Sequence, residues 1–186
     1  MKRVFIIHGW DGTPDEGWLK WIREELEKKG FAVTAPQMPN AEEPKMEEWI
    51  PFVAELVGEP DEDTYFIGHS MGTQTIMRYL QTIHPRKVGG VVLVAGFFNL
   101  INLENEESKR IAAPWIETPI DFEKIKNATS NFRVLLSDND EWVDLESNKK
   151  IFQDKLGAEV IIKESKGHFT EDDDAEQLPE VLEFFN

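Results

Sequence analysis

The stretch Thr64-Tyr65-Phe66-Ile67-Gly68-His69-Ser70-Met71-Gly72 decides the fold of this chain. A short apolar run leads into a Gly-x-Ser-x-Gly sequence, and a helical pattern with Ile76 and Leu80 on one face follows. This order of strand, sharp turn and helix places the serine on a strained backbone at the end of a buried strand. The glycines avoid clashes where strand and helix pack closely, and the helix N-terminus favours negative charge beside the serine. The pattern therefore predicts that Ser70 is a nucleophile.

Six short runs rich in Val, Ile and Phe predict the strands of a sheet. Most are apolar without alternation, which is typical of parallel strands buried on both faces. The runs are Val4–His8, Phe31–Ala35, Thr64–Ile67, Val88–Ala95, Phe132–Leu136 and Val160–Lys163.

Amphipathic segments between these runs predict helices. The first segment closes on Lys28-Lys29-Gly30, a basic last turn followed by a C-cap glycine. Alternation of strand and helix predicts an α/β fold with a mainly parallel sheet and helices on both faces. The length of 186 residues fits one domain, residues 1–186. The apolar stripes are Trp18, Ile22 and Leu26; Met46, Trp49, Ile50, Val53 and Leu56; Ile76 and Leu80; Leu145, Phe152 and Leu156; and Leu178, Val181, Leu182 and Phe185.

One connection, from Ala95 to Phe132, is longer than the others and contains Phe97, Phe98 and Trp115. Ligands of α/β folds bind at the carboxyl ends of the strands, so this segment is a candidate border of a pocket. Packing between strands is the alternative, and the sequence does not decide between them.

Composition and charge narrow the classes of partner. The absence of cysteine excludes disulfides, thiolate metal sites and cysteine nucleophiles, and it fits a cytoplasmic protein. The net charge of −16 disfavours nucleic acid and anionic membrane surfaces, because both attract cationic proteins. No apolar run approaches the roughly 20 residues of a membrane span, and the run Val4–Ile7 is shorter than the core of a secretory signal. We therefore expect a small-molecule substrate.

A serine nucleophile needs a base at neutral pH, and the order of residues points to His168. The four histidines are His8, His69, His84 and His168. Only His168 lies far downstream of Ser70 with acids between them, which is the order of serine, acid and histidine that accompanies this kind of turn.

Two aspartates in the turn Ser137-Asp138-Asn139-Asp140-Glu141-Trp142-Val143 are candidates for the acid. The acid must accept the His168 N–H and hold the tautomer of the imidazole. We favour Asp140, and Asp138 remains the alternative. Because Asp138 is nearer the strand, we expect its side chain to cap the turn.

An oxyanion formed at Ser70 would need two backbone donors. The residue after the nucleophile, Met71, supplies one N–H, and the loop His8-Gly9-Trp10-Asp11-Gly12 supplies a second, for which we favour Trp10. The loop lacks the glycine and lysine patterns of nucleotide-binding loops, so we expect no nucleotide site. The predicted chemistry requires no metal or organic cofactor.

With these residues the chain resembles the α/β hydrolases and, among them, the small single-domain serine hydrolases grouped with retinoblastoma-binding protein nine and YdeN-type proteins. The Gly68–Gly72 motif, the Ser-Asp-Asn-Asp turn and Gly167-His168-Phe169 carry the resemblance, which covers nearly the whole chain. It implies six parallel strands without the two opening strands of larger hydrolases, a Ser–Asp–His triad with Asp140 as the acid, and esterase-like activity. A Leu-x-Cys-x-Glu retinoblastoma-binding motif cannot occur without cysteine, so we do not carry that interaction over.

These observations predict hydrolysis of a small ester or thioester through an acyl-serine intermediate. The Ala95–Phe132 connection is too short for a large lid domain, so we expect neutral short-chain esters to be preferred. Two alternatives stay open: acyl transfer to an acceptor other than water, and an interaction protein that retains the fold.

Overall fold

A computed structural model describes residues 1–103 and 105–186 and contains one six-stranded sheet. The strands lie in the order β2-β1-β3-β4-β5-β6, and every neighbouring pair is parallel. Their bounds are β1 Arg3–Ile7, β2 Ala32–Thr34, β3 Thr64–His69, β4 Gly90–Val94, β5 Phe132–Ser137 and β6 Glu159–Lys163. The α/β fold with a parallel sheet is thus confirmed, and each strand overlaps one of the six apolar runs.

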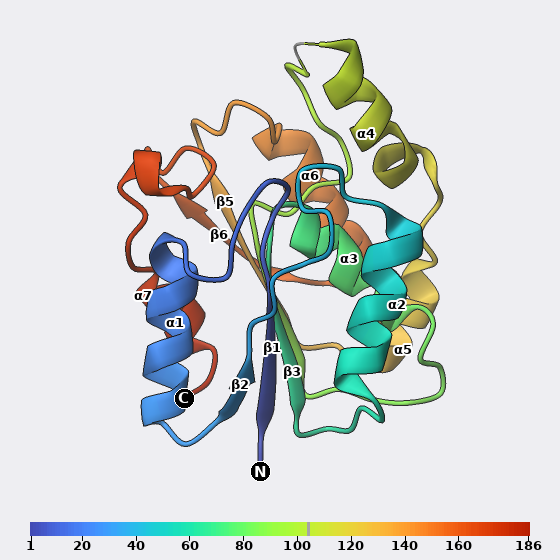
Figure 1. Cartoon of the computed structure of the whole chain (residues 1–186), viewed down its shortest axis with the longest axis vertical. Helices are drawn as coiled ribbons and strands as arrows, with labels where there is room; N and C mark the ends of the chain where they lie inside the picture. The colour runs from blue at the N-terminus through green and yellow to red at the C-terminus, as the bar shows by residue number, and fades with distance from the viewer. Residues whose placement is uncertain (104) are drawn as a thin grey trace.

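Helices cover both faces of the sheet, as predicted (Figure 1). The α1 and α7 helices lie on one face, and α2, α3, α5 and α6 lie on the other. Their bounds are α1 Gly17–Lys28, α2 Met46–Val57, α3 Met71–Leu80, α4 Glu106–Glu117, α5 Phe122–Ala128, α6 Leu145–Ile151 and α7 Pro179–Glu183. A π-helical turn, Phe152–Leu156, extends α6, and a 3₁₀ turn, Glu171–Asp173, precedes α7.

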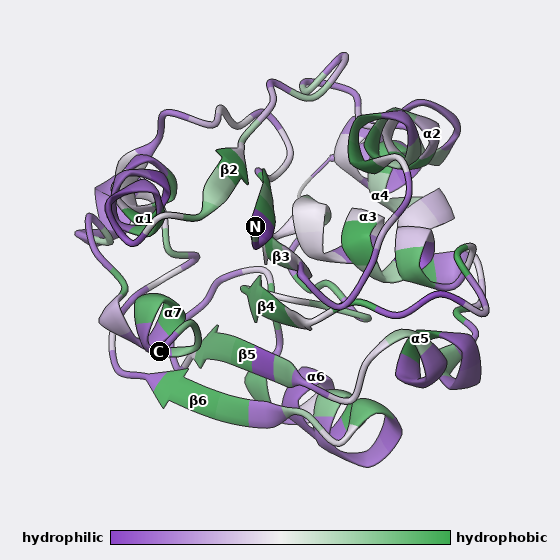
Figure 2. Cartoon of the chain, turned by 90° about the horizontal axis from the view of Figure 1, so that it is seen from below, coloured by the Kyte–Doolittle hydropathy of each residue, from purple (hydrophilic) through white to green (hydrophobic). Residues whose placement is uncertain are grey.

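Alternate residues of the strands fill two separate cores, which explains the absence of polar alternation. Val4 and Ile6 of β1 point into the core under α1 and α7. Phe5 and Ile7 point into the larger core under α2, α3 and α5. Figure 2 shows the strands as mostly hydrophobic bands between helices whose outer sides are hydrophilic. Each fully buried large apolar side chain contributes about 1.5–3 kcal/mol relative to exposure, so the two cores hold the sheet in register.

The connection between β4 and β5 serves both of the roles considered for it. Phe97 and Trp115 are buried in the larger core, whereas Leu100 and Leu103 line a cavity. Buried Arg78 of α3 donates hydrogen bonds to the carbonyl oxygens at the end of α4, 2.7 Å to Trp115 and 2.9 Å to Thr118. A cation at the carboxyl end of a helix is favourable, so α3 anchors the far end of this connection.

Among the described residues, we find no helix that combines the length and the apolar character needed to cross a bilayer.

The carboxyl ends of the strands meet at the edge of the sheet away from the N-terminus (Figure 1). The loops after β1, β3, β5 and β6 therefore come together there, and they carry the residues Trp10, Ser70, Asp140 and His168. Parallel topology alone brings these four positions to one place.

Candidate active site

Ser70 occupies the turn between β3 and α3, with φ 49° and ψ −117°. This is a strained conformation for a residue with a side chain. A Cβ on Gly72 would overlap the carbonyl oxygen of Ile7, and one on Gly68 would lie 2.8 Å from Ile76 Cδ1. The two glycines thus let α3 approach β1 and β3 closely enough to present the Ser70 hydroxyl above the sheet.

Two hydrogen bonds join Ser70, His168 and Asp140. His168 Nε2 is 2.8 Å from Ser70 Oγ, and His168 Nδ1 is 2.8 Å from Asp140 Oδ2. The Asp140 side chain is 1% exposed and that of His168 10%. A carboxylate only accepts, so Nδ1 carries the imidazole proton and Nε2 is left to accept from the Ser70 hydroxyl. The structure brings together the three side chains that the sequence predicted to act together.

Asp138 has a different role from the one expected. Its Oδ1 accepts the Ser165 N–H at 2.8 Å, because the loop after β6 returns over the end of its parallel neighbour β5. The turn itself is capped by Asp140, whose Oδ1 accepts from the N–H groups of Trp142 and Val143 at 2.9 and 3.1 Å. The expectation that Asp138 caps its own turn is therefore wrong. Asp140 uses one oxygen to fix the turn and the other to bind the histidine.

The turn 137–143 (the acid turn) and the loop 164–170 (the base loop) are joined by a series of hydrogen bonds. Four consecutive residues of the acid turn each accept from one of four consecutive residues of the base loop. The pairs are Asp138 with Ser165 N–H, Ser137 with Lys166 N–H, Asn139 with Gly167 N–H and Asp140 with His168 Nδ1–H. These contacts set the distance between acid and base.

The two predicted oxyanion donors lie in the same cavity wall as Ser70. A Cβ placed on Gly9 would be 3.1 Å from the Ser70 Cβ, so the loop carrying Trp10 passes directly beside the nucleophile. Within the described chain, neither the Trp10 nor the Met71 N–H donates a hydrogen bond to another residue. Both donors are therefore available to a ligand.

His8 holds the loop that contains Trp10. Its Nε2 accepts the Met38 N–H at 2.9 Å, so Nδ1 carries the proton and donates to the Gly9 carbonyl oxygen at 2.7 Å. Burial lowers the pKa of His8, which keeps the ring neutral. The sequence located His8 in this loop but did not identify these contacts.

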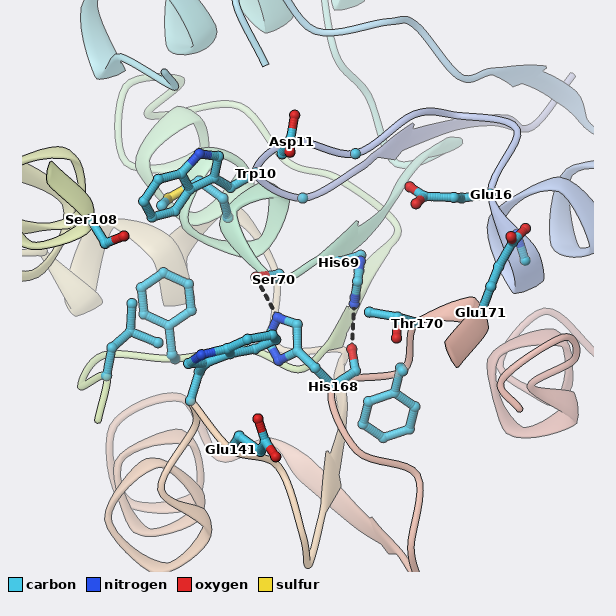
Figure 3. A pocket seen from close by; sticks show the side chains of 18 of the residues that line it. Trp10, Asp11, Glu16, His69, Ser70, Ser108, Glu141, His168, Thr170 and Glu171 are labelled. Atoms are coloured by element: carbon cyan, nitrogen blue, oxygen red, sulfur yellow. Dashed lines mark hydrogen bonds between the residues drawn. The ribbon is translucent and has the colours of Figure 1, made fainter. Parts of the chain in front are cut away.

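A cavity of about 530 Å³ opens beside Ser70 and His168. Figure 3 shows Trp10 and Ser108 at one end, Glu16 and Glu171 at the other, and the serine and histidine between them. Among the described residues, none of those that line it is a lysine or an arginine. Apolar lining comes from Trp10, Trp18, Leu19, Met71, Phe97, Leu100, Leu103, Trp142 and Phe169, and acidic lining from Asp11, Glu16, Glu141 and Glu171.

His69 also belongs to the site, although nothing in the sequence indicated its role. Its Nε2 donates to the His168 carbonyl oxygen at 2.8 Å (Figure 3). Burial, with repulsion from His168, lowers the pKa of His69 to about 3, so the ring is neutral at pH 7. The partner is a main-chain atom 99 positions away, which no sequence pattern marks.

The chain also matches a known protein family, and that family agrees with the geometry of the site. The family model described as serine hydrolase matches residues 4–186. The chain belongs to the serine hydrolase family. Among relatives of this serine hydrolase, YdeN of Bacillus subtilis is 28% identical over 183 residues, which cover 98% of this chain and 93% of YdeN. Serine hydrolase RBBP9 of Rattus norvegicus is 29% identical over 170 residues, covering 90% and 87%.

Solved structures show that the serine hydrolase has the fold of its relatives. The crystal structure of YdeN has a TM-score of 0.89 and 27% identity, covering all of this chain and 99% of YdeN. Est1E of Butyrivibrio proteoclasticus, solved with ferulic acid bound, has a TM-score of 0.72 at 14% identity, covering 100% and 90%, and shares the fold. Membership of this family favours an enzyme over the interaction protein that the sequence left open.

Proposed function

We propose that this serine hydrolase cleaves small esters or thioesters through an acyl-serine intermediate on Ser70. The observation that carries the proposal is the pair of 2.8 Å contacts from Ser70 to His168 and from His168 to Asp140, beside an open cavity. In this tautomer Nδ1 of the neutral imidazole already carries a proton, which it donates to Asp140. The free nitrogen, Nε2, can therefore take the proton of the serine hydroxyl.

In the first half of the reaction, Ser70 Oγ bonds to the substrate carbonyl carbon while His168 Nε2 takes the hydroxyl proton. Asp140 stabilises the imidazolium that forms. Collapse of the tetrahedral intermediate breaks the bond to the alcohol or thiol, and His168 returns the proton to that leaving group. In the second half, water gives a proton to His168 and attacks the acyl carbon, and Ser70 leaves with the proton restored.

The negative charge of the tetrahedral intermediate needs fixed donors. The N–H groups of Trp10 and Met71 support this role because no described residue accepts a hydrogen bond from them and both border the same cavity as Ser70. Removing one donor of such a pair costs about 2.7–4 kcal/mol of transition-state stabilisation in serine hydrolysis. The hydrogen bonds of His8 keep the Trp10 loop in position before substrate arrives.

The cavity favours small, uncharged substrates. Its volume of about 530 Å³ lies in the range of small-ligand sites, roughly 300–1,000 Å³. Trp10, Phe97 and Leu100 offer an apolar wall to a short acyl or alcohol group. Glu16 and Glu171 repel anionic substrates, and the described lining residues include no lysine or arginine to offset them.

A serine-directed fluorophosphonate tests the proposal. We expect one label on Ser70, none in Ser70→Ala, and undiminished labelling in the control Ser130→Ala, whose side chain is exposed. Loss of a triad nucleophile costs on the order of 10⁶ in turnover. An ester and thioester panel of increasing acyl length should then show preference for short neutral chains. Labelling of Ser70→Ala at the wild-type rate would overturn the assignment.

A further inference from the structure

The backbone on both sides of His168 is held by side chains from other segments. On the amide side, the His168 N–H donates to Asp173 Oδ2 at 2.9 Å. On the carbonyl side, the His168 oxygen accepts from His69 Nε2–H at 2.8 Å. These two groups belong to the two peptide planes that flank the His168 Cα. Fixing both planes fixes the direction of the Cα–Cβ bond and hence where the imidazole can reach.

This support matters because the base loop is strained. Gly167 has φ 48° and Phe169 has φ 59°, on either side of His168. A bulky residue in this region costs on the order of 1–3 kcal/mol, and the conformation persists only when surrounding contacts impose it. The Trp18 indole contributes one such contact, since its N–H donates to the Phe169 carbonyl oxygen at 3.1 Å.

Asp173 and His69 are themselves held in place by further contacts. Asp173 Oδ2 also accepts from the Thr170 N–H at 3.0 Å and from its hydroxyl at 2.7 Å. Burial opposes ionisation of this carboxylate, but the donors from Thr170 and His168 outweigh it and lower the pKa of Asp173. The ring of His69 packs edge-on against Trp18, with 5.7 Å between ring centroids.

We propose that His69 and Asp173 are a positioning pair that holds the backbone of His168 and so aims its imidazole at Ser70. This inference rests on the proposed function, in which His168 is the base. His69 is the last residue of β3 and directly precedes Ser70, so the nucleophile and the support of its base are neighbours in the chain. A displacement of about 1 Å between reacting groups can cost on the order of 100-fold in rate.

The test compares two substitutions at His69. His69→Leu removes the Nε2–H donor, whereas His69→Gln keeps an amide donor at a similar reach. We expect His69→Leu to lower kcat and the rate of fluorophosphonate labelling about 10–100-fold with KM unchanged. His69→Gln should recover most of that loss, and the matched control His84→Leu, at an exposed histidine, should behave as wild type. Wild-type rates in His69→Leu, or equal losses in Leu and Gln variants, would overturn the proposal.

A second measurement separates this proposal from the proposed function. The Nδ1–H of His168, bonded to Asp140, should give a slowly exchanging downfield proton signal in the wild type and in His69→Gln. That signal should broaden or vanish in His69→Leu while circular dichroism shows a folded protein. A signal that persists unchanged in His69→Leu refutes the positioning pair. If the wild type is not labelled but the proton signals behave as expected in all three proteins, the proposed function is refuted and the positioning pair is not.

Discussion

Replacing His69 by Gln should make the protein less sensitive to mild acid. In the folded state, burial, with repulsion from His168, lowers the pKa of His69 to about 3. In the unfolded chain the same group has its ordinary pKa of 6.5. Between these two values the unfolded state binds a proton that the folded state excludes. The free energy of unfolding therefore falls as pH drops below 6.5 and stops falling for this group near its folded pKa.

The size of the effect follows from these two values. If the folded ring stays fully neutral, the free energy of unfolding falls by about 2 kcal/mol between pH 7 and pH 5. The ring borders the cavity and keeps partial contact with solvent, so we expect roughly half of this, about 1 kcal/mol. In a protein of this length that amounts to about 2–4 °C in melting temperature.

Melting curves at pH 7 and pH 5 measure the difference directly. The wild type and the exposed control His84→Gln should lose the same number of degrees, and His69→Gln should lose about 2–4 °C less. His8, whose pKa is lowered by burial, contributes equally to all three proteins and cancels. Equal losses in His69→Gln and wild type would show that the folded ring takes up a proton as readily as the unfolded one.

Three further tests concern other parts of the structure. Asp140→Asn should lower kcat by up to about 10⁴-fold because an amide favours the wrong imidazole tautomer, whereas Asp138→Asn should keep turnover; kinetics showing the opposite ranking would exchange their roles. Arg78→Met should lower the free energy of unfolding by about 2–4 kcal/mol, because buried carbonyl groups of the α4 region lose their donor; an unchanged denaturation curve would contradict this. Gly72→Ala should lower the melting temperature more than Gly157→Ala, which has positive φ but open space; equal shifts would argue against close packing of α3 on β1.

The fold was predictable because its determinants are local and repeated. Each strand lies on an apolar run, the inner strands are almost fully buried, and Gly68–Gly72 fixes how β3 passes into α3. The grouping of Ser70, His168 and Asp140, which two contacts of 2.8 Å join, was predictable from their order in the chain and from their places at strand ends. The partners of His69 and Asp138 were not, because both bind main-chain atoms of the base loop. Any residue supplies such atoms, so the sequence carries no mark of where they lie.

The paired bonding of acid turn and base loop bears on how this enzyme can change length. An insertion or deletion between Ser137 and Asp140, or between Ser165 and His168, would break part of this pairing and move Asp140 relative to His168. We therefore expect the protein to tolerate changes of length better in other loops. The segment after β4 is one such place. In its described part, the contacts with the acid turn are Ile101 N–H to the Trp142 carbonyl oxygen at 2.8 Å and Asn102 Nδ2 to the Glu141 carbonyl oxygen at 2.7 Å. Residues added or removed farther along this segment would reshape the cavity mouth and leave the spacing of acid and base unchanged.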